Sequence, residues 1–177
     1  MNRRRFLIGS SVGIASLAAA GFTWTQLSNA SQPLTIDSAL ELLDSIDLSK
    51  AKSTTTWSLS QVFIHCAQSV ECSIKGFPEH KSALFQETVG SLAFSLFKAS
   101  GSMTHNTTEE IPALISFQPN ISLKPAIDYL KTQLIAFKHY NGKLQPHFAY
   151  GDLNKREYEI AHVLHLLDHC SEIEFES

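Results

Sequence analysis

Three of the eight histidines in this chain lie in one short stretch, HVLHLLDH, at positions His162, His165 and His169. At about 100° per residue in an α-helix, the side chains of His165 and His169 lie about 40° apart on adjacent turns. Two imidazoles in this arrangement can bind the same metal ion. A catalytic zinc ion usually has three protein ligands and one open solvent position, so a third ligand must come from another part of the chain.

The best candidate for the third ligand is His65, which lies in the middle of an apolar helical segment where an unpaired imidazole would be costly to bury. The helical wheel leaves two alternatives open, because His165 and His169 lie opposite the apolar stripe of their own segment. In the first alternative, these two side chains line a cleft beside the core and bind metal. In the second, they are exposed to water. The helical pattern alone favours exposure to water. The remaining histidines are expected at the surface: His80, His105, His139 and His147.

The elements that would position these histidines are two helices with strong terminal signals. The first begins at Ser58, which forms a capping-box pattern with Gln61, and it ends at Gly76. The last begins at Asn154 and continues through the histidine cluster to about Ile173.

Three more helices are predicted, over about residues 35–46, 82–98 and 125–141. Their apolar residues recur with a period of 3.6 rather than 2, and no hairpin signal is present. The chain is therefore predicted to be an all-α bundle. The expected buried stripes are Leu40, Leu43 and Ile46 in the first, Phe85, Val89, Leu92 and Leu96 in the second, and Ile127, Leu130, Leu134 and Phe137 in the third.

Composition and charge indicate one ordinary globular domain. The chain has 177 residues, of which 44% are hydrophobic and 18% charged. Its formal net charge is −3 and it has no basic run, which argues against nucleic acid as a partner. The chain has three cysteines, Cys66, Cys72 and Cys170. A disulfide between Cys66 and Cys170 is one alternative, but three buried thiols are the favoured interpretation.

The first thirty residues are predicted to be an export signal rather than part of the fold. Arg3, Arg4 and Arg5 precede a nearly uncharged apolar stretch from Phe6 to Phe22, and Ser28-Asn29-Ala30 has the spacing of a cleavage site. The segment resembles a bacterial twin-arginine signal. The twin-arginine pathway transports folded proteins, often with their cofactors already bound. A general secretory signal or a single membrane anchor is the alternative. The domain at 31–177 is therefore expected in the periplasm, either free or tethered to the inner membrane.

Two segments, residues 57–78 and 146–175, resemble an uncharacterised domain-of-unknown-function family within the DinB/YfiT-like superfamily of metal-binding helical bundles. They are WSLSQVFIHCAQSVECSIKGFP and PHFAYGDLNKREYEIAHVLHLLDHCSEIEF. The resemblance implies a four-helix bundle core with an additional helix. It also implies a metal site formed by His65, matching a histidine of the second helix, and by His165 and His169, matching the H-x3-H pair of the last. His162 lies outside this pattern, and Asp168 stands where the family has the first of two adjacent histidines.

Neutral imidazoles favour Zn²⁺, with Ni²⁺ or Fe²⁺ also suitable, and three of them leave positions for water or a substrate. The expected function is a metal-dependent hydrolase or transferase that activates water or a thiol and acts on a small molecule. No further catalytic residue is assigned, because Glu71 and Asp168 are expected to be surface charges. A non-catalytic metal- or ligand-binding module of the periplasm is the alternative, and a homodimer is left open.

Overall fold

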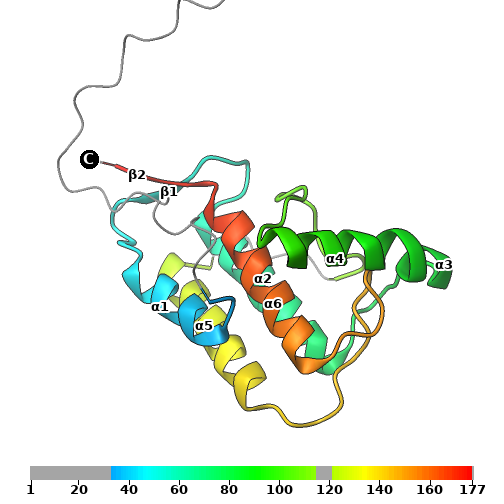
Figure 1. The fold of residues 1–177 in the computed structure, drawn as a ribbon. Coiled ribbons are helices and arrows are strands. Elements are labelled where there is room, and N and C mark those ends of the chain that lie inside the picture. The colour runs from blue at the N-terminus through cyan, green and yellow to red at the C-terminus, as the bar shows by residue number, and fades with distance from the viewer. Residues whose placement is uncertain (1–32, 115–120, 177) are drawn as a thin grey trace, which may run out of the picture.

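The structure, a computed structural model, describes residues 33–114 and 121–176 and is mainly helical (Figure 1). The predicted export signal at residues 1–30 lies outside the described residues. The prediction of an all-α fold is confirmed, with the addition of one small sheet. The helices are α1 (Ile36–Ser45), α2 (Leu59–Lys75), α3 (Ala83–Phe85), the π-helical turn η2 (Gln86–Gly90), α4 (Ser91–Ser100), α5 (Leu123–His139) and α6 (Lys155–Cys170), and the strands are β1 (Ala51–Ser53) and β2 (Ile173–Phe175).

The two helices that carry the histidine candidates begin where the sequence predicts. Both bonds of the capping box at Ser58 are present in α2, which ends at Gly76 with a positive φ of 105°. A second capping box at Asn154 opens α6. The end of α6 differs from the prediction, because the chain leaves the helix after Cys170 and Ile173 begins β2.

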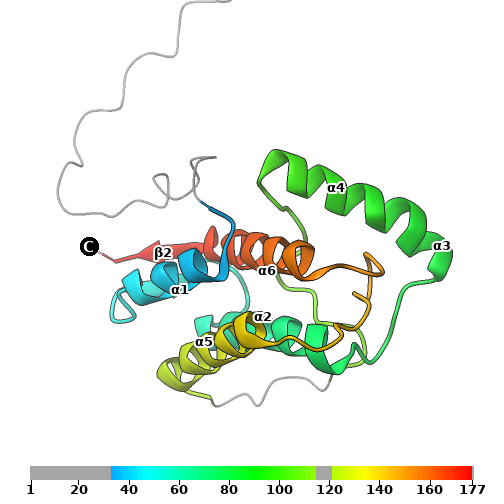
Figure 2. The same ribbon diagram turned by 60° about the horizontal axis from the view of Figure 1, so that its bottom comes forward.

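The core lies between α2, α5 and α6, with α1 packed against α5 and α6 (Figures 1 and 2). The predicted stripe of α5 is buried, although this helix begins two residues before Pro125. In α1 the buried face is shifted from the prediction, since Leu42 is buried and Leu40 only half-buried. The largest fully buried side chains are Tyr158, Phe63, Phe137, Ile36, Leu43, Ile127, Leu130, Leu134, Leu164, Leu166, His169 and Cys170.

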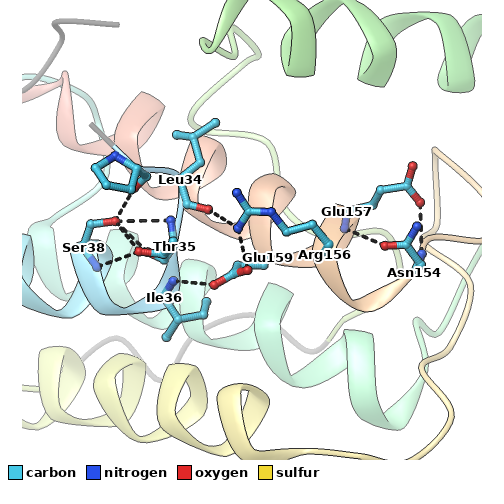
Figure 3. Close-up of polar contacts among 9 residues, drawn as sticks. Leu34, Thr35, Ile36, Ser38, Asn154, Arg156, Glu157 and Glu159 are labelled. Atoms are coloured by element: carbon cyan, nitrogen blue, oxygen red, sulfur yellow. Dashed lines mark hydrogen bonds and ion pairs between the residues drawn. The ribbon is translucent and has the colours of Figure 1, made fainter. Parts of the chain in front are cut away.

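Polar contacts join the start of α1 to the first turns of α6 (Figure 3). The backbone N–H of Ile36 donates to Oε1 of Glu159 at 3.0 Å, and Nη1 of Arg156 donates to the carbonyl of Leu34 at 2.9 Å. Arg156 and Glu159 also form an ion pair at 2.6 Å. The contact to Glu159 satisfies an N–H of the first turn of α1 that no helical hydrogen bond can satisfy, and together these contacts hold α1 and the residues before it against α6.

The predicted buried stripe of the 82–98 segment is wrong. Val89, Leu92 and Leu96 are exposed, whereas Phe94 and Gly90 are buried. The helix formed by α3, η2 and α4 is set apart from the other helices in Figure 2 and contacts α6 through α4. Periodicity indicates that one face is apolar, but not which face a neighbouring element covers.

Gly90 lies where this helix meets the loop at residues 147–151. A Cβ atom added at Gly90 would lie 1.9 Å from the carbonyl oxygen of Ala149. Only a residue without a side chain allows the two backbones to approach so closely. The glycine that weakens the helical pattern in the sequence is therefore required by packing.

A two-stranded antiparallel sheet joins the approach to α2 with the end of α6. Strand β1 pairs with β2 in the register Ala51↔Phe175, Lys52↔Glu174 and Ser53↔Ile173. Because β1 precedes α2 and β2 follows α6, this pairing fixes the two helices at one end. Among the described residues, no helix has the length and hydrophobicity needed to cross a membrane.

Candidate metal centre

The structure brings together the three histidines that the sequence singles out. Nε2 of His65, on α2, lies 3.2 Å from Nε2 of His165, on α6, and that atom lies 3.1 Å from Nε2 of His169. With Zn–N bonds of 2.0–2.1 Å and tetrahedral angles, two ligand nitrogens lie about 3.3 Å apart. The spacing of these nitrogens therefore fits a common metal ion.

None of these imidazoles is fully exposed to water. His65 is 4% exposed and His169 is 1% exposed, while His165 is half-buried. Burial lowers the pKa of His65 to about 4 and that of His169 to about 3, with the neighbouring imidazoles adding to both shifts. The same causes hold the pKa of His165 well below its ordinary value. All three side chains are neutral at pH 7, so their lone pairs are available to a metal ion.

A fourth histidine, His105, belongs to the cluster, and its prediction as a surface residue is wrong. One ring nitrogen from each of His65, His105, His165 and His169 lies within 4.8 Å of the other three, and the set could hold a metal ion. The His105 ring centroid lies 4.9 Å from that of His165. His105 comes from the segment between α4 and α5, and a histidine outside a helix gives no periodic signal in the sequence.

Asp168 positions His105. Its Oδ2 atom lies 2.5 Å from Nδ1 of His105 and accepts a hydrogen bond from the backbone N–H of the same residue at 3.1 Å. The contact to Nδ1 lacks the geometry of a hydrogen bond, so the backbone contact is the one that meets it. With a side chain 12% exposed, Asp168 is not the surface charge that the sequence predicts.

Trp57, immediately before α2, packs on two of the imidazoles. Its ring centroid lies 5.1 Å from that of His65 in an edge-to-face arrangement and 6.5 Å from that of His169 in a stacked one. The indole thus places an apolar surface beside the cluster, where it limits the access of water. The cysteine next to each of these histidines, Cys66 and Cys170, is a buried free thiol, as is Cys72, and no disulfide forms.

Several ring nitrogens near the cluster have no hydrogen-bond partner among the described residues, namely both nitrogens of His105, Nδ1 of His169 and Nε2 of His162. Unpaired buried polar groups are unusual in folded proteins. A metal ion bound by the cluster would satisfy one of these atoms, a ring nitrogen of His105, since His169 faces the cluster with Nε2 and His162 lies outside it. The donor set, neutral imidazoles only, fits a divalent transition metal better than Mg²⁺ or Ca²⁺.

The cluster lies on the wall of a cavity of about 320 Å³. His65, His105 and His165 line it, whereas His169 is not among the lining residues. The other walls include charged, aromatic and apolar side chains, among them Lys81, Phe85, Met103, Glu109, Glu110, Ile111, Phe148 and Tyr150. A molecule in this cavity would therefore reach the histidine cluster from one side.

The remaining histidines divide into two groups. His80 and His139 are exposed, as predicted. His147 is buried, contrary to the prediction, and lines the cavity together with His162. His162 stacks on Tyr158 with ring centroids 5.3 Å apart and is not one of the four clustered histidines. Glu71, also considered from the sequence, pairs with Lys75 and accepts a hydrogen bond from Tyr129 instead.

The fold and the site together define a helical protein with buried histidines that could hold a metal ion at a cavity. A family model described as "Protein of unknown function (DUF1569)" matches residues 30–175, and the chain belongs to that family. No curated protein and no solved structure matches the chain.

Proposed function

We propose that this protein is a metal-dependent enzyme of the DinB-like superfamily, in which His65, His165 and His169 bind one divalent transition metal. The observation that carries the proposal is the convergence of three Nε2 atoms, at 3.1 and 3.2 Å, on the wall of a cavity. We expect Zn²⁺, with Ni²⁺ or Fe²⁺ as alternatives. The reaction class is hydrolysis or group transfer on a small molecule.

When bound, such an ion lowers the pKa of a coordinated water or thiol and polarises a carbonyl group. The protein's own residues prepare this chemistry. The depressed pKa values of the imidazoles keep the ligands unprotonated, so protons do not compete with the metal at neutral pH. Trp57 shields the cluster on one side, and the cavity leaves another side open to a substrate.

His105 determines whether the site suits catalysis or binding alone. If all four imidazoles bind the ion, the tetrahedral site is closed, as in structural zinc sites. If His105 stays outside the coordination shell, a fourth position is left for water or a substrate, and the cavity that His105 lines gives access to it. We favour the second arrangement, because His105 comes from the segment between α4 and α5, whereas the other three histidines are held on the helices α2 and α6. A non-catalytic metal-binding module is the second candidate, and the presence of four histidines favours it.

We propose further that residues 1–30 direct export to the periplasm by the twin-arginine pathway, on the basis of the paired arginines Arg3 and Arg4 and the apolar stretch that follows. Replacing both arginines by lysine should block export. Normal export of this double variant would favour the general secretory route instead.

Metal analysis of the purified chain tests the site. We expect about one zinc, nickel or iron ion per chain. His165→Ala should lose most of it, because two histidines retain zinc far less well than three. His139→Asn is the matched control, since His139 is exposed and distant from the cluster in sequence. Full metal retention by His165→Ala, or a wild-type chain that cannot be loaded with any of the three metals, would contradict the proposal.

Activity tests distinguish the two candidate functions. The metal-loaded and metal-free chains are compared on panels of esters, amides and thiol-transfer substrates. Turnover that requires the metal and is lost in His165→Ala supports the enzyme. A tightly bound ion without metal-dependent turnover on any panel supports the binding module.

A further inference from the structure

We propose that His147 is a fixed hydrogen-bond donor that binds a carboxylate oxygen of the molecule held in the cavity. This inference deepens the proposed function, on which it rests, by naming the substrate class: a small organic acid with an apolar or aromatic group. The geometry that carries it is the placement of a neutral imidazole of known tautomer on the same cavity as the histidine cluster.

Two backbone groups determine the tautomer of His147. Nδ1 accepts hydrogen bonds from the backbone N–H of Ala149 at 3.1 Å and from that of Tyr150 at 3.2 Å. A backbone N–H can only donate, so Nδ1 carries no proton and Nε2 does. Nε2 has no hydrogen-bond partner among the described residues, because all contacts of the ring nitrogens go to Nδ1.

The ring remains neutral as well as fixed. His147 is 7% exposed and stacks on Tyr150 with ring centroids 4.2 Å apart and an interplanar angle of 6°. Burial, with the neighbouring histidines His162 and His80 adding to it, lowers its pKa to about 3. A neutral imidazole that presents N–H is a known means of binding and polarising a carbonyl oxygen.

The loop that carries this donor is rigid. His147 and Gly151 exchange two backbone hydrogen bonds, at 2.7 and 3.1 Å. The side chain of Gln86 donates to the carbonyls of His147 and Phe148 at 3.2 and 3.0 Å, and Gly90 allows the helix to pack directly on this loop. A donor held in this way loses little freedom when an acceptor binds, which is the condition for strong binding by a neutral group.

The charges and apolar groups of the cavity favour a singly charged organic acid. Lys81, Glu109 and Glu110 line the cavity from exposed positions, where solvent screens their charges, whereas a divalent ion beside Asp168 would leave one net positive charge at the histidine cluster. The aromatic walls, Phe148 and Tyr150, provide apolar surface for the rest of the molecule. A carboxylate has two oxygens, so one can accept from His147 while the other remains free for a second contact in the cavity.

Benzoate binding to the full chain tests the inference. His147→Asn is the informative variant, because the asparagine oxygen can accept the Ala149 N–H in an Asx turn and so replace Nδ1, while nothing replaces Nε2–H. We expect the dissociation constant of benzoate to rise at least about tenfold, as for the loss of a hydrogen bond to a charged group. The zinc content should stay the same, the thermal midpoint should fall because the stacked ring is lost, and His139→Asn should bind benzoate like the wild type.

Nitrogen NMR of the His147 ring provides a second measurement. We expect a proton on Nε2, none on Nδ1, and a downfield shift of the Nε2 proton on addition of benzoate. Equal benzoate affinity in His147→Asn, a proton on Nδ1, or no saturable binding by the wild type would overturn the inference. Binding that depends on His147 in a chain that takes up no metal would support the inference and contradict the metal-dependent function alone.

Discussion

Asp168 contacts His105 twice, once at the ring and once at the backbone, although 63 residues separate them. This pair attaches the segment between α4 and α5 to the helix that carries His165 and His169. Because Asp168 immediately precedes His169, any displacement of this carboxylate also reaches the histidine cluster. The burial of Met103 and Ile111 also holds this segment in place, and the pair orients His105 within it.

Removal of Asp168 is therefore expected to weaken metal binding without abolishing it. In Asp168→Ala, His105 loses both contacts and α6 loses the charge beside the cluster. The loss of a negative charge beside a divalent ion is expected to lower the metal affinity by about 10-fold. Competition with a chelator of known affinity measures the change, with the exposed Asp152→Ala as the control. An affinity equal to that of the wild type would mean that the pair only closes the loop.

Replacement of His105 should leave one metal ion per chain. In His105→Ala, His65, His165 and His169 still supply three nitrogens, the usual number in a catalytic zinc site. Loading with Co²⁺ and recording its visible absorption spectrum gives both the stoichiometry and the geometry. An unchanged spectrum is expected. Loss of the ion in this variant would show that four histidines are needed, and would favour the binding module.

The metal-free protein should lose stability as the pH falls below about 6.5, the ordinary pKa of histidine. Burial lowers the pKa of His147 and of His162 to about 3. Between these values the unfolded chain binds protons that the folded chain does not, so acid favours unfolding. Each such group contributes a slope of up to about 1.4 kcal/mol per pH unit.

Urea unfolding at several pH values between about 6.5 and about 5 measures this slope. In His162→Phe, the decrease in stability per pH unit should be smaller by the contribution of one histidine, because a phenylalanine ring cannot be protonated. His139→Asn should leave it unchanged. A slope that is the same in His162→Phe and in the wild type would show that His162 is not neutral and buried in the folded chain.

Gly90→Ala is expected to destabilise the protein by about 1–3 kcal/mol, as overpacked sites typically do. The added methyl group would lie 1.9 Å from the carbonyl oxygen of Ala149, so the helix and the loop must separate. Chemical denaturation compares this variant with Ser95→Ala, an exposed position of α4. Since the same loop carries His147, benzoate binding should weaken as well. Unchanged stability would mean that the helix is free to move away from the loop.

Much of the fold can be predicted from local chemistry. The caps at Ser58 and Asn154 and the buried stripe of α5 depend on nearby residues and the helical period, which the sequence contains directly. The face of α4 depends instead on which element covers it, and here the periodicity points to the wrong side. The strands β1 and β2 have three residues each and are too short to show a period. They also lie near opposite ends of the described chain, so no local signal indicates that they pair.

The candidate site shows the same division. His65, His165 and His169 were found from their spacing and from the resemblance to a family. His105 and His147 were missed because each lies outside a helix, and only contacts made in three dimensions, with Asp168 and with two backbone N–H groups, give them a role. The one available signal was Asp168 itself, an acidic residue between histidines.

The pairing of β1 with β2 also sets the order in which the protein can be assembled. Strand β2 and the helix α6, which carries His165 and His169, follow all the other described elements in the chain and are therefore synthesised after them. During synthesis, α1, α2 and α5 can form and pack while the histidine cluster still lacks two of its members. The full cluster can therefore bind a metal ion only after α6 has been synthesised, so α1, α2 and α5 must first pack without the help of the metal.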